Sequence, residues 1–391
     1  MHELTRENLD SVLGAGPIAA FDDRVIALFD HVSASILAHP ASREFRDLAT
    51  YGFFIRSRNL NKVKRRYLES QVDLIGRGMA FHVGPSNVPL NFAYSMTVSL
   101  LAGNPTVVRI SSRDFQQANI LVSLFDHALE ALELRNMLSV VQYPRTSEYN
   151  QILSAACDIR VIWGGDQTIA AFREFPVRAH AVELHFANRH SALVVDSRAY
   201  LEEYQPVEVA QKFYRDIYPF DQNACTSPKF VFWIGDATEN LKAQAAFWSA
   251  LQDVLVESGY KSDMGVGVRH FKSSAAIAAD FDVRQQTAYE HPNLTVLDVS
   301  EPAQALMNRA CSEGFFLQAQ MTDLSALRIY LDHRCQTMSY VGDLREALLT
   351  CIVQQRMRAI DRIVPVGSTA QFSFTWEGKD LVRVMSRSFP T

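Results

Sequence analysis

The chain has 391 residues, of which 48% are hydrophobic and 21% are charged, and its formal net charge at pH 7 is -5. This composition is typical of a folded protein and excludes a disordered or low-complexity chain. The slightly acidic balance gives no field that would gather nucleic acid or an anionic membrane. The length favours two domains, or one large α/β unit, over a single small domain.

The first residues, MHELTRENLDSVLGAG, lack the basic-then-apolar layout of a signal peptide. No run reaches the ~18 apolar residues needed to span a bilayer. We therefore expect a cytoplasmic protein without a membrane span. The basic cluster RSRNLNKVKRRY, residues 56–67, is expected to be a solvated helix face.

The five cysteines are widely spaced and include no C-x-x-C pair. An odd number without close pairs indicates reduced thiols and argues against a disulfide framework or a zinc ribbon. His333 and Cys335 lie close in the sequence, but two ligands do not complete a tetrahedral site. No metal site is expected.

From residue 79 onward, short apolar runs alternate with longer amphipathic segments, which is the pattern of βαβ units and a mostly parallel sheet. In the first half, strands are predicted at 79–84, 106–110, 138–143 and 158–165, with helices at 90–103 and 114–132. In a second set, strands are predicted at 191–196, 229–235 and 294–299, with helices at 207–218 and 238–258. Residues 259–291 are expected to be helix and loop, and residues 368–388 a hairpin with its turn at Glu377-Gly378.

Three junctions follow predicted strands, where open α/β sheets bind ligands. In HVGPSNVPL, residues 82–90, Ser86 and Asn87 are placed to hold an anion or an oxyanion, although Asn87 as a simple helix cap is favoured by the local pattern alone. In VVRISSRD, residues 107–114, Arg113 favours a cofactor with a 2′-phosphate if a dinucleotide binds.

Ser111 and Ser112 of that second junction are explained equally well as helix caps.

The third junction is VIWGGDQTI (161–169), where Gly164 and Gly165 permit a phosphate or a nicotinamide to approach the backbone closely. None of the three contains G-x-G-x-x-G, so the standard dinucleotide fingerprint is absent.

Cys225 stands in FDQNACTSPKF, among small and polar residues just before a predicted strand. A buried structural thiol is the commoner fate of a single cysteine, but this neighbourhood favours an accessible nucleophile. Asn223 and nearby backbone N–H groups are expected to stabilise its thiolate.

The ordered set GPSNVP, AGNPTVVRISS, VIWGGD, VELHF and DQNACTSP resembles the aldehyde dehydrogenase superfamily, most closely its acyl-CoA reductase branch, typified by the fatty acid reductase of bacterial luminescence. The likeness covers about residues 75–235, and DRIVPVG and the WEGKDLVRVMSR tail add to it. It implies a two-domain α/β fold with a Rossmann-like cofactor domain at 1–185, a catalytic thiol domain at 186–360, and a return segment with a C-terminal oligomerisation hairpin at 361–391.

Carried over residue by residue, the resemblance makes Cys225 the acylated thiol, with Asn87 and the Cys225 backbone N–H holding the oxyanion. Glu183 matches the superfamily's general base. The glycine pair that follows this base in the superfamily is His185-Phe186 here, which argues against base-catalysed hydrolysis. The cofactor-binding residues it implies are Ser86, Ser111, Ser112, Arg113, Gly164, Gly165, Asp166, Ile169 and Leu184.

The resemblance implies an NADPH-dependent reductase of an acyl thioester, with acyl-CoA or another acyl carrier as donor, and with NADPH preferred over NADH. It also implies a homo-oligomer and a possible acyl-protein synthetase or acyl carrier partner. Two alternatives stay open: an aldehyde dehydrogenase that hydrolyses its acyl-enzyme, and a non-reducing subunit that transfers acyl groups through Cys225.

Overall fold

The computed structural model describes residues 6–69, 72–262, 264–300 and 303–390. The chain forms two compact units: unit 1 comprises Met1–Ala187 and Lys379–Thr391, and unit 2 comprises Asn188–Gly378. The segment 361–391, predicted as a single return segment, is therefore divided, because its residues up to Gly378 belong to unit 2.

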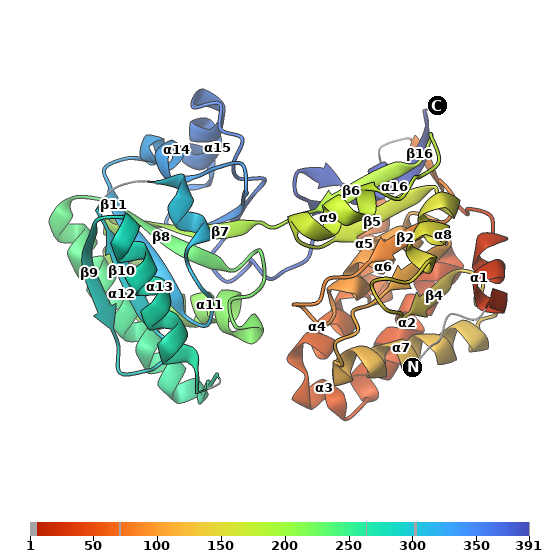
Figure 1. Ribbon diagram of the computed structural model, residues 1–391, viewed down its shortest axis with the longest axis horizontal. Coiled ribbons are helices and arrows are strands. Elements are labelled where there is room, and N and C mark those ends of the chain that lie inside the picture. The colour runs from red at the N-terminus through yellow and green to blue at the C-terminus, as the bar shows by residue number, and fades with distance from the viewer. Residues whose placement is uncertain (1–5, 70–71, 263, 301–302, 391) are drawn as a thin grey trace. The chain divides into compact units, whose positions relative to one another are not determined.

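Unit 1 is built on a five-stranded parallel sheet in the order β4-β3-β2-β5-β6 (Figure 1). Strands β2, β3 and β5 are buried along their whole length, as expected for parallel strands covered on both faces. The predicted alternation of strands and helices in this half is confirmed. The strands are β2 (Ala80–Val83), β3 (Thr106–Arg109), β4 (Leu138–Val141), β5 (Ile159–Trp163) and β6 (Val182–Phe186).

A separate two-stranded antiparallel sheet in unit 1 joins β1 (Val72–Gly76) to β16 (Ser386–Pro390). The basic cluster at 56–67 lies on a helix, α5, as predicted. The helices of unit 1 are α1 (Arg6–Leu13), α2 (Asp23–Ala38), α3 (Ala41–Glu44), α4 (Arg46–Phe54), α5 (Ser57–Leu68), α6 (Asn91–Leu101), α7 (Gln116–Ala131), α8 (Tyr149–Ala156), α9 (Asp166–Arg173) and α16 (Leu381–Met385).

Unit 2 contains a seven-stranded sheet in the order β13-β12-β7-β8-β11-β10-β9. Its neighbouring strands run parallel, except that the edge strand β9 is antiparallel to β10. Residues 259–291 contain this strand as well as a helix, so the prediction of helix and loop was incomplete. The strands are β7 (His190–Asp196), β8 (Pro228–Ile234), β9 (Val283–Ala288), β10 (Thr295–Val299), β11 (Phe315–Met321), β12 (Cys335–Val341) and β13 (Arg362–Pro365).

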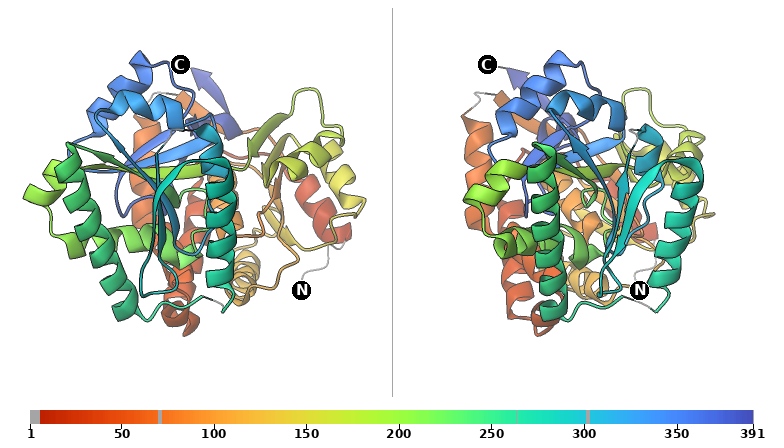
Figure 2. Two further views of the ribbon diagram at one scale, coloured as in Figure 1. Left: turned by 60° about the vertical axis from the view of Figure 1, so that its left-hand side comes forward. Right: turned by 90° about the vertical axis from the view of Figure 1, so that its left-hand side faces the viewer.

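Helices α12 and α13 lie on opposite sides of this sheet, as the right-hand view of Figure 2 shows. The long helix α12 begins with a capping box: the Asp236 side chain accepts from the backbone N–H of Glu239, and the Glu239 side chain accepts from the backbone N–H of Asp236. The helix ends at Gly259, which has a left-handed backbone conformation. The helices of unit 2 are α10 (Ser197–Glu203), α11 (Pro206–Ile217), α12 (Ala237–Ser258), α13 (Val266–Asp280), α14 (Leu327–Tyr330) and α15 (Arg345–Gln354), with single turns at Tyr218–Phe220, Gln304–Asn308 and Leu324–Ala326.

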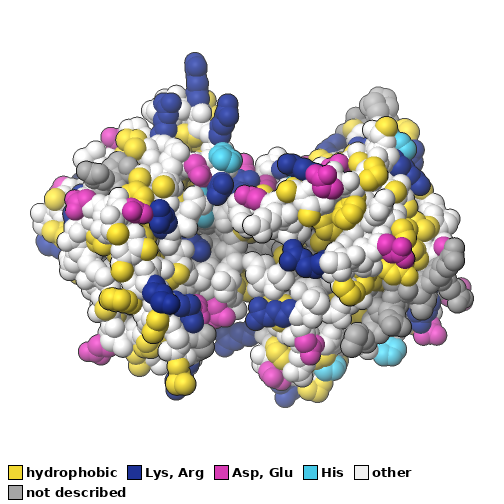
Figure 3. Space-filling view, in the orientation of Figure 1, with side chains coloured by type: hydrophobic (Ala, Val, Ile, Leu, Met, Phe, Trp, Pro, Cys, Tyr) yellow, Lys and Arg dark blue, Asp and Glu magenta, His cyan; other side chains and the backbone are white. Residues whose placement is uncertain are grey.

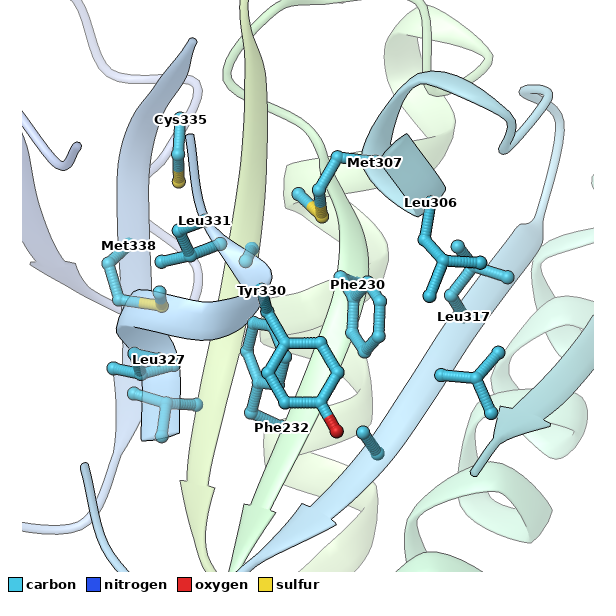
Figure 4. Packing of buried hydrophobic residues seen from close by; sticks show 14 of the residues in the cluster. Phe230, Phe232, Leu306, Met307, Leu317, Leu327, Tyr330, Leu331, Cys335 and Met338 are labelled. Carbon is cyan, nitrogen blue, oxygen red and sulfur yellow. The ribbon is translucent and has the colours of Figure 1, made fainter. Parts of the chain in front are cut away.

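An aromatic group lies at the centre of the core on one face of this sheet (Figure 4). Phe230 and Phe232 stack with ring centroids 4.4 Å apart, and Tyr330 packs against both rings. These two phenylalanines fill the core and so hold strand β8, which follows the Cys225 loop, firmly in the sheet.

The tail differs from the predicted hairpin in its second half. Strands β14 (Thr375–Trp376) and β15 (Lys379–Asp380) do flank a turn at Glu377-Gly378. The chain then forms helix α16 and strand β16, whose partner is β1 of the same chain. The terminal strand β16 therefore pairs within the same chain.

None of the helices in the described ranges is long and apolar enough to cross a membrane. Charged side chains of both signs are scattered over the face shown in Figure 3.

Candidate active site

The loop after β2 carries Ser86 and Asn87 at the carboxyl edge of the unit 1 sheet, where both are exposed. Helix α6 begins at Asn91 with Leu90 as its N-cap, and no side chain caps it. The alternative in which Asn87 caps this helix is therefore wrong. Asn87 belongs to unit 1 and Cys225 to unit 2, and their shared oxyanion role stays a prediction.

A small pocket, partly open to solvent, lies at the carboxyl ends of β2, β3 and β4. Ser111 and Arg113, both predicted from the sequence, line it. Gln142 fixes the loop behind them, because its Nε2 donates to the backbone oxygen of Ser111 at 2.7 Å. The lining residues are Pro85, Pro89, Phe92, Ile110, Ser111, Arg113, Phe115, Ala118, Asn119 and Gln142.

The serines of this junction do not cap the next helix. Helix α7 begins at Gln116 after Phe115, without a side-chain cap. Ser111 instead accepts a hydrogen bond from the backbone N–H of Arg113 at 3.1 Å. The Arg113 guanidinium lies over the Phe115 ring, 4.9 Å from its centre. This contact places the positive charge of Arg113 at the pocket.

Arg109, which the sequence analysis did not single out, is a buried cation at the end of β3. Its Nη2 donates to the backbone oxygen of Tyr143 at 3.2 Å, and its Nε has no hydrogen-bond partner among the described residues. A buried donor without a partner is costly, so this edge of the sheet is suited to an anionic ligand.

Gly164 and Gly165 lie where β5 leads into α9, with Gly165 as the N-cap. A Cβ added to Gly164 would lie 3.0 Å from the Thr168 side chain, so any other residue here would press Thr168 out of its place. Arg145 donates to Thr168 Oγ1 at 2.9 Å and places a positive charge near the start of the helix. Backbone N–H groups and a cation together favour an anion here.

Two other predicted cofactor residues, Asp166 and Ile169, lie on α9. Asp166 is exposed at the start of the helix, and Ile169 is buried. Leu184, on β6, is also buried. Ile169 and Leu184 thus pack in the interior and Asp166 lies at the surface of the junction, and the cofactor contacts of all three stay predictions.

Glu183 is held in an ion pair on β6. Arg160, which is almost completely buried, contacts Glu183 Oε2 through Nη2 at 2.7 Å, and His185 Nε2 lies 3.0 Å from the same oxygen. Burial raises the pKa of Glu183, but the hydrogen bonds and charge of Arg160, with those of His185, outweigh it and leave the pKa below its usual value.

The position of Glu183 along β6 follows from the register of the sheet. The partner of Glu183 in β5 is Arg160, three residues before that strand ends at Trp163. Glu183 thus lies about 10 Å back from the carboxyl edge, at 3.3 Å per residue.

Replacing Glu183 with glutamine tests this arrangement. The change leaves the buried Arg160 guanidinium without its carboxylate, so we expect a loss of about 1–3 kcal/mol in the free energy of unfolding at neutral pH. Because the pKa of Glu183 is lowered by folding, its contribution is present above the unfolded pKa of about 4.3 and is lost as the pH falls through the folded pKa. Urea unfolding measured at neutral and acidic pH should show the two proteins converging at low pH. If the difference in unfolding free energy between the two proteins were the same at both pH values, the proposed contribution of the ion pair would be contradicted.

In unit 2, the loop that carries Cys225 is fixed by Gln222. Asp221 and Gln222 both have left-handed backbone conformations, with φ of 49° and 59°. The Gln222 amide is fully buried and joins the starts of β8 and β11. Further along, Ser191 Oγ donates to the backbone oxygen of Cys225 at 2.7 Å. The thiol is thus placed on a rigid loop at the amino end of β8.

The Cys225 side chain is half-buried. Burial raises the pKa of its thiol to about 11, assisted by the negative charge of Glu377, while Gln336 as a hydrogen-bonding neighbour and the charge of Arg189 act in the opposite direction. The backbone N–H of Cys225 lowers the pKa of the thiol, in the direction expected, and the role of Asn223 stays a prediction. Desolvation and a nearby carboxylate outweigh the polar groups of the loop.

Sequence reasoning missed Gln336, Glu377 and Arg189 as neighbours of the thiol. Glu377 stands in the WEGKD segment, which was noted only for its turn and its family likeness. Gln336 and Arg189 lie in no motif, and nothing in the local sequence marks them.

Solved aldehyde dehydrogenases share this fold across the whole chain. An aldehyde dehydrogenase from Physcomitrella patens, solved with succinate, superposes with a TM-score of 0.69 at 13% identity, covering 98% of this chain and 88% of that one. A glyceraldehyde-3-phosphate dehydrogenase from Methanocaldococcus jannaschii, solved with NADP, superposes with a TM-score of 0.64 at 10% identity, covering 100% of this chain and 94% of that one. These superpositions show an aldehyde-dehydrogenase-like fold, which confirms the predicted fold class.

The sequence matches the model of the acyl-CoA reductase (LuxC) family over residues 56–257, just over half of its length. The chain belongs to this family. The matched region contains Asn87, Arg113, Glu183 and Cys225.

Curated relatives are similar over part of the chain. A protein named long-chain acyl-protein thioester reductase 2, from Photobacterium leiognathi, is 28% identical over 213 residues, which are 54% of this chain and 41% of that protein. A long-chain acyl-protein thioester reductase from Vibrio harveyi is 30% identical over 177 residues, which are 44% of this chain and 36% of that protein. The matched stretches thus span well under half of the relatives' own lengths.

Proposed function

We propose that the protein reduces an acyl thioester to the aldehyde through a covalent acyl group on Cys225, with a nicotinamide cofactor as reductant. The observation that carries the proposal is the family match, which includes the Cys225 loop and the strand-end loops of unit 1. The names of the relatives, which describe long-chain acyl-protein thioester reductases, support the same reaction class.

In the first half-reaction, the Cys225 sulfur attacks the thioester carbonyl carbon, the bond from that carbon to the donor sulfur breaks, and the thiol proton leaves with the donor as its free thiol. This step needs no external oxidant or reductant. The fixed loop holds the sulfur in place, and Asn87 with the Cys225 backbone N–H is proposed to hold the oxyanion. When bound, the reduced nicotinamide supplies the hydride that, with one proton, converts the acyl group to the aldehyde and restores the thiol.

The residues of unit 1 fit a phosphorylated cofactor. The pocket at the ends of β2 and β3 offers Arg113 and the Ser111 hydroxyl, and Arg109 Nε nearby lacks a partner among the described residues. We propose that Ser86, Ser112, Gly164, Gly165 and Asp166 also contact the cofactor, and that Arg113 makes NADPH preferred over NADH.

Replacing Arg113 with alanine should raise the dissociation constant for NADPH about 10- to 100-fold and leave that for NADH nearly unchanged, because a charge-assisted bond to the 2′-phosphate contributes about 1.5–3 kcal/mol. Fluorescence titration of both cofactors measures this. Arg135→Ala, which removes an exposed arginine paired with Glu130, is the matched control. If the dissociation constants of NADPH and NADH rose by the same factor, the basis for the NADPH preference would be lost.

The geometry of Glu183 disfavours the oxidative alternative. A general base must be free to take a proton from water, whereas this carboxylate is bound to Arg160 and His185. We propose that the acyl group on Cys225 is protected from hydrolysis for this reason, and that Glu183 serves the structure of β6.

We also propose a homo-oligomer, because β16 is an edge strand: β1 lies on one side of it, and no strand of the described residues pairs with its other side. Size-exclusion chromatography with light scattering tests this, and a monomer at all concentrations would contradict it.

The testing experiment is the consumption of NADPH and of NADH by the purified protein with three donors: acyl-CoA, an acyl carrier thioester, and an acyl-protein. Aldehyde formed in step with cofactor oxidation supports the reductase, and the preferred donor identifies the partner. Acyl transfer to Cys225 without cofactor oxidation would identify the transfer subunit instead. Carboxylic acid formed from added aldehyde would identify the dehydrogenase.

A further inference from the structure

The chain passes between the two units at two places, and a charged residue of unit 2 stands beside each of them. The first connection lies between residues 187 and 188, and the second lies between residues 378 and 379. Arg189 closely follows the first connection, and Glu377 closely precedes the second. The two connections therefore have opposite charges at their unit 2 ends.

Arg189 and Glu377 contact each other, although 188 positions of the chain separate them. Arg189 Nη1 lies 3.3 Å from Glu377 Oε2, and the two side chains are largely buried, at 16% and 4% exposed. Salt screens such a pair less than it screens an ion pair at the surface. The pair thus joins the two connections to each other within unit 2.

The other donors of Arg189 fix the position of its side chain. Nε donates to the backbone oxygen of Arg334 at 3.0 Å, and Nη2 donates to the carboxylate of Asp361. A guanidinium presents its N–H groups in a rigid fork, so three separate segments of unit 2 hold this side chain in one orientation. Arg189 is therefore a fixed point beside the first connection.

Glu377 is fixed in the same way beside the second connection. Its Oε1 accepts from Gln336 Nε2 at 2.7 Å, so both carboxylate oxygens have partners. With φ of 47° at Glu377 and 70° at Gly378, the turn has the left-handed conformation that asparagine-glycine pairs adopt most readily. A disfavoured backbone persists where its surroundings determine it, and the partners of the carboxylate do so here.

We propose that the Arg189–Glu377 pair unites the two connections into a single joint, and that both are positioning residues for the reaction. Two connections tied at one point restrict the motion that two separate, flexible connections would allow. This role in the reaction rests on the proposed function, which needs Cys225 of unit 2 and the cofactor pocket of unit 1. A looser joint lowers the fraction of molecules in which the acyl group meets the cofactor.

The joint is tested by trypsin cleavage of the folded protein, with the cut sites identified by mass spectrometry. In Glu377→Gln, cleavage after Arg189 at the first connection should become about tenfold faster, because the loss of a charge-assisted hydrogen bond raises the population of the open state. In Arg189→Gln, cleavage after Lys379 at the second connection should become about tenfold faster for the same reason.

Glu313→Gln is the matched control. Glu313 also has a left-handed backbone, precedes a left-handed glycine and pairs with an arginine, Arg269, but it lies at neither connection. This variant should leave cleavage at both connections at the native rate.

The effect on the reaction is tested by steady-state kinetics of the same variants. The kcat for aldehyde formation should fall about tenfold in Arg189→Gln and in Glu377→Gln, and no further when both substitutions are combined, because the same pair is lost in all three proteins. The dissociation constant of the cofactor should not change, since the pocket lies within unit 1.

The proposal would be overturned if cleavage at either connection were no faster than in Glu313→Gln. It would also be overturned if an active protein kept its native kcat in the single variants, or if the two effects on kcat multiplied. If Glu377→Gln does not fold, Glu377→Asn removes the same charge with a residue that the turn favours.

Proteolysis needs neither acyl donor nor cofactor, so the joint and the proposed function fail separately. A protein that forms no aldehyde and still shows the faster cleavage keeps the joint and loses the proposed function. A protein that forms aldehyde without the faster cleavage in its variants keeps the proposed function and loses the joint.

Discussion

Replacing Cys225 with alanine is expected to lower aldehyde formation from acyl thioesters by at least about 1,000-fold, because the covalent path through the sulfur is lost. The variant should still bind the nicotinamide cofactor, since the pocket lies in unit 1. The measurement is aldehyde trapping together with cofactor oxidation. Mass spectrometry after mixing with the donor alone should show an added acyl group in the native protein and none in the variant.

Cys311→Ala is the matched control, because Cys311 is another half-buried thiol of unit 2. This variant should keep both the added acyl group and the activity. If Cys225→Ala formed aldehyde at the native rate, the assignment of the nucleophile would be wrong.

The second large effect is expected from Gln222→Leu. The native amide donates to the backbone oxygens of Pro228 and Phe315, and its Oε1 accepts from the N–H groups of Gly314 and Phe315. Leucine leaves these buried backbone groups unpaired, and the left-handed backbone of this position is common to both proteins and cancels. We expect a loss of about 2–4 kcal/mol in the free energy of unfolding.

Denaturant unfolding gives this value directly, and acylation of Cys225 should slow at the same time because the loop loses its anchor. Gln252→Leu is the comparison, since Gln252 accepts one hydrogen bond from the Glu290 backbone and is partly exposed. Equal effects of the two substitutions would show that Gln222 has no special role in holding the loop.

The sequence predicted the two α/β units because runs such as TVVR and IRVIW are buried on both faces, and continuous apolar runs separated by helices indicate parallel strands. The helix starts were predicted to within two residues, at 90 and 114 against Asn91 and Gln116, but the capping residues were not. Asn87, Ser111 and Ser112 are good capping residues, yet the N-caps of the two helices are Leu90 and Phe115, neither of which caps with its side chain.

Cys225 could be singled out because its small, polar neighbours differ from those of the other cysteines. Its electrostatic surroundings could not be predicted. Gln336 and Glu377 are separated by 41 positions, and their meeting depends on a bulge and a turn that no local pattern specifies. The segment 236–350 contributed nothing to the functional interpretation of the sequence, yet it supplies Gln336.

The pairing of β1 with β16 has a consequence for biosynthesis. The ribosome makes Val72 early, but its partner Pro390 emerges only after all of unit 2 has been made. Strand β1 therefore waits with an open edge while the intervening residues are translated, and such an edge can pair with other chains. Slow or stalled translation within unit 2 would lengthen this wait, so the yield of native protein should depend on the speed at which its middle section is synthesised.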